Sequence, residues 1–192
     1  MNNKKSLGLL LVAGLLAALL GAGAKYWWRD NGSVMPDVAR KSAQLSSVFY
    51  RQSMQDLAGQ PHPFAQYQGQ WVVVNFWATW CPPCVEEMPE LDGIYKAIGR
   101  NGTKMLGIAI DSPSAVRAFQ EQVNVTYPLV LGGFDGTELA TALGNKSGGL
   151  PYTAIIDPNG EVVWQKGGRI DAAKLLDAVG RLTAAPPDAR SR

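Results

Sequence analysis

The chain contains only two cysteines, Cys81 and Cys84, within the stretch NFWATWCPPCVEEMP. Three kinds of chemistry fit such a pair. As a structural staple it closes so small a loop that the entropic gain is only about 2 kcal/mol. As a closed zinc site it needs about two further ligands, and the one histidine, His62, stands far off between two prolines. A redox-active dithiol is the interpretation that the sequence favours.

The position of the pair supplies a mechanism for redox chemistry. A near-continuous apolar run, residues 71–77, predicts a buried strand that ends just before Cys81. Residues 82–99 carry apolar side chains at helical spacing, so Cys81 should face the unsatisfied N–H groups and the positive dipole end of a helix. Cys84, one turn inside, should be shielded. We therefore expect Cys81 to attack a substrate and Cys84 to resolve the mixed disulfide.

The remaining pattern alternates between strands and helices. Strand-forming residues occur at 47–54, followed by a turn-rich loop at 59–70. Further along we predict a strand, a helix capped by Ser112, a short strand, a short helix closed by Gly144, a hairpin around 158–160 and a helix capped by Asp171. This order predicts an α/β fold with a central mixed sheet and helices on both faces.

The N-terminus differs from the rest of the chain. Residues 6–24 carry no charge and as a helix would span about 28 Å, close to a hydrocarbon core. Tyr26, Trp27 and Trp28 follow, as is typical of a membrane interface. We predict an uncleaved single-pass anchor at 1–29; the alternative is a signal peptide cleaved after residues 22–24.

The predicted organisation is thus anchor, polar spacer at 30–44, one domain at 45–184 and a disordered tail at 185–192. We expect the domain to lie outside the cytoplasm as a monomer. A formal net charge of +2 without basic blocks gives no support to nucleic-acid binding.

The motifs VVVNFWATWCPPC, EEMP, GLPYTAIIDPNG and the glycine pair at 167–168 together resemble the thioredoxin superfamily. Within it the chain is similar to the membrane-anchored TlpA/ResA-type thiol-disulfide oxidoreductases, which include the cytochrome c maturation thioredoxins. The resemblance covers about residues 49–183. It implies a thioredoxin-like fold and a periplasm-facing reductase of the bacterial inner membrane that needs no cofactor. It also implies protein substrates, such as apocytochrome c or copper-site cysteines, and a membrane-embedded thiol donor.

The same resemblance implies roles for individual residues. Pro151 should be a cis-proline facing the cysteines, and Leu150 should pair with a bound peptide. Glu87 matches an acid that ResA-like proteins place near their cysteines, where it could relay the proton of Cys84. A simpler alternative is that Glu87, like Glu86, only complements the helix dipole.

Four neighbouring positions complete the predicted site. Thioredoxins carry a buried aspartate where this chain has Asn75, which does not titrate. Pro89 matches a helix-kinking proline. We expect Trp80 to cover the disulfide and offer apolar surface to partners, and Trp77 to be part of the core.

Several other functions stay open. The same motif serves oxidants as well as reductants. A peroxidase shares the fold, although peroxiredoxins have threonine where this chain has Ala78. A copper-delivery module or a redox-inert tethered interaction module are the non-enzymatic alternatives.

Overall fold

The strand that leads to the cysteines, β3 (Val72–Trp77), lies inside a seven-stranded sheet in the computed structural model of the protein, which describes residues 48–184. The predicted anchor, spacer and C-terminal tail lie outside the described residues. Within 48–184, none of the helices is long and apolar enough to cross a bilayer. The other strands are β1 (Ser53–Asp56), β2 (Pro61–Pro63), β4 (Lys104–Ala109), β5 (Leu129–Leu131), β6 (Tyr152–Ile156) and β7 (Val162–Gly167).

The sheet is mixed, as predicted. Its strand order is β2-β1-β5-β4-β3-β6-β7. β3 runs parallel to β4 and antiparallel to β6, while β6 and β7 form the predicted hairpin. All six residues of β3 are buried, as expected for a central strand covered on both faces.

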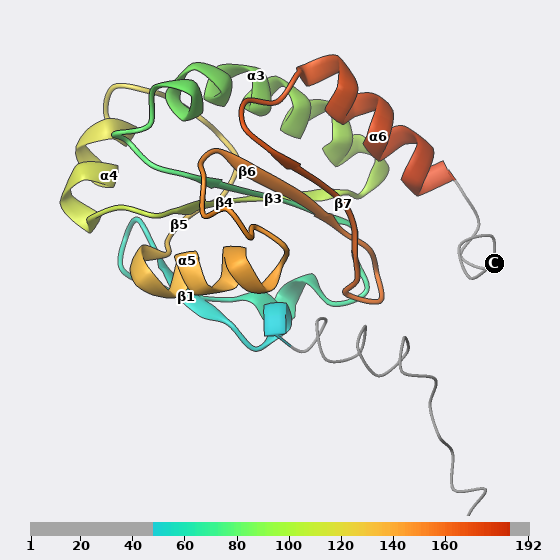
Figure 1. Cartoon of the computed structure of the whole chain (residues 1–192), viewed down its shortest axis with the longest axis horizontal. Coiled ribbons are helices and arrows are strands. Elements are labelled where there is room, and N and C mark those ends of the chain that lie inside the picture. The colour runs from blue at the N-terminus through green and yellow to red at the C-terminus, as the bar shows by residue number, and fades with distance from the viewer. Residues whose placement is uncertain (1–47, 185–192) are drawn as a thin grey trace, which may run out of the picture. The chain divides into compact units, whose positions relative to one another are not determined.

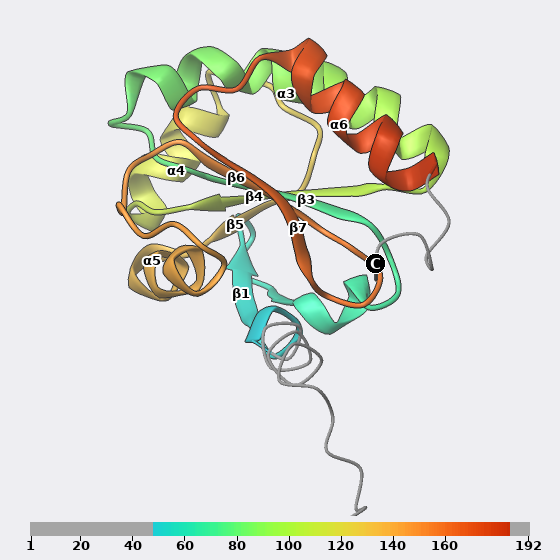
Figure 2. The ribbon, with the colours of Figure 1, turned by 45° about the vertical axis from the view of Figure 1, so that its right-hand side comes forward.

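Helices cover both faces of this sheet. They are α3 (Pro82–Ile98), α4 (Pro113–Gln120), α5 (Gly133–Ala142) and α6 (Ala172–Ala184). α3 and α6 lie side by side over one face, and α5 covers the other (Figures 1 and 2). Val116, the buried residue of α4, belongs to the same core cluster as the buried residues of α6 and most of those of α3. The predicted architecture is therefore confirmed for the described residues.

Alternation along β3 decides which of its side chains can meet the active-site helix. Val72, Val74 and Phe76 pack in the core under α5, whereas Val73 and Trp77 pack in the core under α3. Asn75 shares the face of Val73 and Trp77 because successive strand residues point to opposite faces. A polar side chain is thereby directed from β3 toward α3.

The predicted caps are present where the helices begin. The Ser112 hydroxyl accepts a hydrogen bond from the N–H of Ala115 at 3.3 Å. The Asp171 carboxylate accepts one from the N–H of Lys174 at 3.1 Å. Each cap satisfies one of the N–H groups that the first turn of a helix leaves free.

The expected strand at 47–54 and the loop at 59–70 are partly wrong. Val48–Tyr50 are helical, because this conformation buries Phe49 against the ring of Phe64, 5.0 Å away, and packing overrides the strand propensity of aromatic residues. The strand starts only at Ser53. The loop contains the edge strand β2, where prolines are tolerated, and a 3-10 helix, η1 (Phe64–Tyr67).

The short helix predicted before Gly144 is α5, which starts at Gly133. Gly132 allows this start, because a Cβ there would lie 2.5 Å from Cγ2 of Ile108. The close approach brings the first turn of α5 onto the sheet directly after β5. A second 3-10 turn, η2 (Gly99–Asn101), extends the end of α3.

Candidate active site

Cys81 and Cys84 form a disulfide at the start of α3. Cys81 is the N-cap residue and Cys84 lies in the first turn, with an S–S distance of 2.07 Å. Cys84 is fully buried, as expected, and Cys81 is 4% exposed. Of the two cysteines, Cys81 is thus the one with surface left in contact with solvent.

The expectation that free N–H groups face Cys81 is wrong. Pro82 and Pro83 are the first helical residues and have no N–H. The N–H groups of Cys84 and Val85 both donate to the Cys81 carbonyl, at 3.0 and 3.2 Å. A Cys81 thiolate would therefore be stabilised by the aligned peptide dipoles of α3 and not by hydrogen bonds from free N–H groups.

Glu87 is completely buried beneath the active-site turn. Its exposed fraction is 0%, and it lies on α3 three residues after Cys84. Oε1 accepts a hydrogen bond from Nδ2 of Asn75 at 2.9 Å, and Oε2 accepts one from the N–H of Ile170 at 2.9 Å. Its neighbour Glu86, by contrast, is exposed and pairs with Arg169.

Asn75 connects Glu87 to the strand behind it. Its Nδ2 also donates to Oγ1 of Thr153 at 3.1 Å, and the two residues are direct partners in the β3–β6 register. The Oδ1 atom of Asn75 is buried and has no hydrogen-bond partner among the described residues. The amide therefore uses both of its donor hydrogens toward Glu87 and Thr153.

Burial raises the pKa of Glu87 above its ordinary value, because the charged form loses its hydration. The hydrogen bonds from Ile170 and Asn75 and the positive charge of Arg169 act in the opposite direction, and Glu90 adds to the rise. A buried carboxyl with a raised pKa is suited to exchanging a proton at a pH closer to neutral.

The Leu150–Pro151 peptide bond is cis, as the resemblance implies. Pro151 is buried, and its carbonyl accepts a hydrogen bond from the N–H of Gly168 at 2.8 Å. Within residues 48–184, the N–H and C=O of Leu150 make no backbone hydrogen bond, while its side chain packs against the core.

The two tryptophans differ as predicted in their exposure. Trp77 is fully buried in the core next to α3, which confirms its expected place. Trp80 is 65% exposed and directly precedes Cys81. Pro89 lies inside α3, where it removes one helical hydrogen bond.

Three contributors to the site were missed from the sequence: Thr153, Arg169 and the backbone of Ile170. Each acts through a contact with a residue far away in the chain, so local spacing gives no signal. Thr153 could have been found from the strand alternation that places it opposite Asn75 once β3 and β6 are paired.

The contacts recorded for His62 are with Tyr67 and Phe64 and not with the cysteines. Its Nε2 forms a hydrogen bond with the Tyr67 hydroxyl at 2.8 Å, and burial lowers its pKa. In the part of the chain that the structure describes, no group of three or more His, Cys, Asp or Glu residues is placed to hold a metal ion.

Comparison with known proteins agrees with this geometry. Residues 42–165, more than half of the chain, match the AhpC/TSA family. This chain belongs to the AhpC/TSA family. The thioredoxin-like fold and the resemblance to ResA-type proteins are thereby confirmed.

Individual relatives and solved structures add detail. The thiol-disulfide oxidoreductase ResA of Halalkalibacterium halodurans is 30% identical over 149 residues, which cover 77% of this chain and 80% of that protein. ResA of Geobacillus kaustophilus is 37% identical over 108 residues, but these span 56% of this chain and only 60% of the relative. The crystal structure of a thioredoxin-family thiol:disulfide interchange protein from Chlorobium tepidum TLS has a TM-score of 0.59 at 27% identity. It covers 70% of this chain and 93% of that one.

Proposed function

We propose that this protein is an extracytoplasmic thiol:disulfide oxidoreductase that reduces disulfides in protein substrates through Cys81 and Cys84. One observation carries the proposal: the two cysteines form a disulfide at the start of α3, where Cys81 is 4% exposed and Cys84 and Glu87 are fully buried. Relatives named thiol-disulfide oxidoreductase support it.

The reaction uses the two sulfurs in sequence. In the reduced protein the Cys81 thiolate attacks one sulfur of a substrate disulfide, and the other substrate sulfur leaves and takes up a proton. Cys84 then loses its proton to the Glu87 carboxylate and attacks the Cys81 sulfur, which releases the second substrate thiolate. Two electrons pass to the substrate, and the protein is left with its Cys81–Cys84 disulfide. The first substrate thiolate takes its proton from solvent, and the proton that Glu87 accepted from Cys84 passes to the second substrate thiolate or to solvent.

Substrate contacts are assigned to the exposed surface around Cys81. Trp80 offers an apolar face, and the free backbone groups of Leu150, next to cis Pro151, can pair with an extended peptide. We infer cysteine-containing protein segments as substrates, with apocytochrome c or copper-site cysteines as the first to test.

The electrons must be resupplied, and we assign this step to a membrane-embedded thiol donor. The apolar segment at 6–24 supports anchoring of residues 1–29 in the bacterial inner membrane with the domain facing the periplasm. Membrane fractionation combined with protease accessibility in intact spheroplasts tests both location and orientation.

The deciding experiment is the reduction potential of the full-length protein in detergent, measured in defined thiol buffers with trapping of free thiols. A value of about −270 mV supports a reductase, whereas about −120 mV makes the protein an oxidant and reverses the proposed electron flow. A pair that does not titrate as a two-electron couple overturns the enzymatic proposal and favours an interaction module.

The role of Glu87 has a separate test. In the reduced Glu87→Gln variant, the pKa of the cysteine thiols should shift, because the variant removes a titrating neighbour. Cysteine titration identical to that of the wild type would exclude Glu87 as the proton acceptor of Cys84.

Peroxidase activity is the nearest alternative function, because peroxiredoxins share the thioredoxin-like fold. Position 78, three residues before Cys81, carries alanine rather than the threonine of the peroxiredoxin pattern. Consumption of hydrogen peroxide by the reduced protein, compared with consumption of a disulfide substrate, distinguishes the two activities.

A further inference from the structure

Three consecutive residues between β7 and α6 each bind a different part of the candidate site. The N–H of Gly168 donates to the Pro151 carbonyl at 2.8 Å. The guanidinium of Arg169 contacts the carboxylates of Glu86 at 3.3 Å and Glu90 at 2.8 Å. The N–H of Ile170 donates to Glu87 at 2.9 Å. The segment therefore joins the cis-proline to the buried acid.

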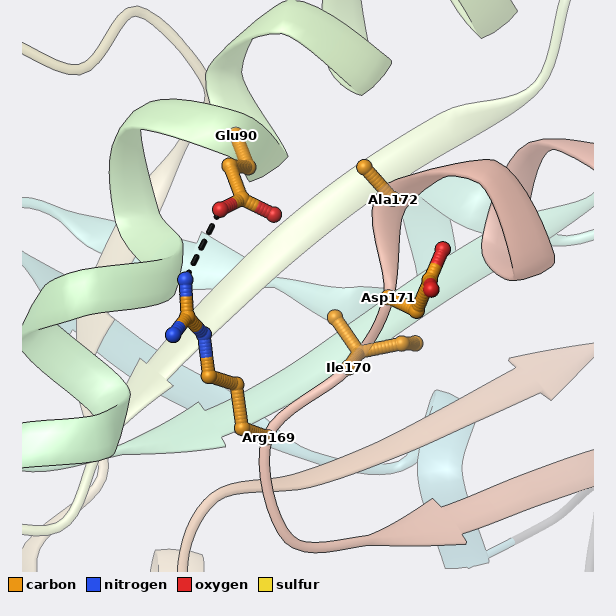
Figure 3. Close-up of a pocket in the computed structure, with 5 residues that line it drawn as sticks. All are labelled: Glu90, Arg169, Ile170, Asp171 and Ala172. Atoms are coloured by element: carbon orange, nitrogen blue, oxygen red, sulfur yellow. Dashed lines mark hydrogen bonds and ion pairs between the residues drawn. The ribbon is translucent and has the colours of Figure 1, made fainter.

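Arg169 is the residue that fixes this segment against α3. Glu86 and Glu90 are four residues apart and thus lie on one side of the helix, facing solvent, while Glu87 points inward. Figure 3 shows the Arg169 side chain reaching from the segment before α6 to Glu90 on α3. Because the Arg169 side chain is bound to the outer face of α3, the following residue, Ile170, is held where its N–H reaches Glu87.

The energetics of these ion pairs indicate that Arg169 positions the segment and adds little to the stability of the fold. The side chains of Arg169, Glu86 and Glu90 are 47%, 60% and 42% exposed, and ion pairs so open to water contribute little to folding. The Ile170–Glu87 hydrogen bond is buried, so a small displacement of the segment would remove a donor from a carboxylate that water does not reach.

We propose that Arg169 is a positioning residue that holds the Ile170 amide on the Glu87 carboxylate and thereby keeps Glu87 able to ionise. For the thiol chemistry this rests on the proposed function, in which ionised Glu87 accepts the proton of Cys84. Without Arg169, a larger fraction of Glu87 would hold its own proton, and that fraction could not accept the proton of Cys84.

The groups that face Glu87 each affect its protonation equilibrium. Asn75 on β3 and the Ile170 amide favour the ionised form, as does the charge of Arg169, while Glu90 opposes it. Tyr127, in the segment before β5, is buried and stays neutral because burial raises its pKa. Replacing Arg169 removes one favourable charge and loosens one favourable hydrogen bond, so both changes act in the same direction.

The test uses the full-length protein in its disulfide form, labelled with ¹³C at glutamate carboxyls, with the Glu87 signal assigned by its loss in Glu87→Gln. In Arg169→Gln we expect the protonation equilibrium of Glu87 to shift by about threefold or more toward the protonated form. We also expect hydrogen exchange of the Ile170 amide to become about tenfold faster. The matched control is Arg181→Gln, which breaks an exposed ion pair with Asp177 on α6 and should change neither quantity.

Arg169→Lys separates position from charge: it keeps the charge but loses the fork that reaches two carboxylates, so Ile170 exchange should still accelerate. This variant also decides the matter if Arg169→Gln does not fold. Unchanged exchange of the Ile170 amide in the Arg169 variants overturns the proposal, even if the Glu87 equilibrium moves, because Arg169 would then act by charge alone. Neither measurement needs electron transfer, so a redox-inactive cysteine pair would overturn the proposed function without affecting this result.

Discussion

The Nδ2 atom of Asn75 lies 2.9 Å from Oε1 of Glu87, so that a neutral amide on β3 stabilises an acid on α3 beneath the two cysteines. Both side chains are fully buried. An amide donates to a carboxylate without adding charge, whereas a second acid at position 75 would compete with Glu87 for ionisation. The Asn75–Glu87 pair therefore contains one carboxyl group rather than two.

Asn75→Asp tests this pairing. Two carboxylates about 3 Å apart cannot both ionise in a buried site, so the variant should lose about 3 kcal/mol of unfolding free energy at pH 7.5 relative to wild type. Most of that loss should disappear at pH 4.5, where the pair holds a proton. Denaturant unfolding at the two pH values measures it, with Asn75→Leu as the uncharged control. An equal loss at both pH values would contradict the coupling.

Glu87→Gln should change how stability depends on pH. The folded pKa of Glu87 lies above its ordinary value of 4.5, so the folded state binds the proton more tightly than the unfolded state. The resulting stabilisation is complete below pH 4.5 and is lost as the pH rises through the folded pKa. Wild-type stability should fall in this window relative to Glu87→Gln. Parallel pH profiles of the two proteins would show that the pKa of Glu87 does not change on folding.

Cys84→Ser should trap the substrate complex. Cys81 is the one of the two cysteines that retains solvent-exposed surface, and without Cys84 the mixed disulfide has no internal thiol to resolve it. Non-reducing electrophoresis after incubation with a disulfide-containing protein should show an adduct for Cys84→Ser. Cys81→Ser, the matched control, should give none. An adduct of equal yield with Cys81→Ser would reverse the assigned roles.

Variants of Trp80 and Trp77 distinguish a role in substrate binding from a role in folding stability. Trp80 is 65% exposed, so Trp80→Ala should leave stability within about 0.5 kcal/mol while raising the KM for a protein substrate. Trp77 is fully buried, and Trp77→Ala should cost about 3–5 kcal/mol. Thermal unfolding and steady-state kinetics on both variants check this. A KM unaffected by Trp80→Ala would remove Trp80 from the substrate surface.

Gly107 and Gly93 test how packing limits substitution by alanine. A Cβ at Gly107 on β4 would lie 2.5 Å from Cδ2 of Leu129 and 2.9 Å from Cε2 of Tyr127, so Gly107→Ala should destabilise by about 1–3 kcal/mol. Gly93 is exposed on α3, and among the described residues no neighbour lies within 4 Å of such a Cβ. Gly93→Ala should stabilise by about 0.5–1 kcal/mol. Denaturant midpoints of the two variants should move in opposite directions.

The sequence by itself determined the order of elements from β3 onward and the place of the cysteines. Periodicity and turn residues are local signals, and they predicted β3, α3, β4, the hairpin and α6, together with the caps at Ser112 and Asp171. The same signals were weaker where packing opposes propensity. Phe49 is helical rather than extended because its ring is buried against Phe64.

The chemistry of the site depended on contacts that only the tertiary structure decides. Sequence spacing placed Glu87 near Cys84, but its burial, its two hydrogen-bond donors and the resulting pKa come from Asn75, Ile170 and Arg169, which reach it from other elements. The sequence shows that Pro82 and Pro83 have no N–H, whereas the bonding of the Cys84 and Val85 N–H groups to the Cys81 carbonyl is a property of the folded helix. Local propensity fixes where elements begin, whereas desolvation and long-range hydrogen bonds exist only once the elements have packed.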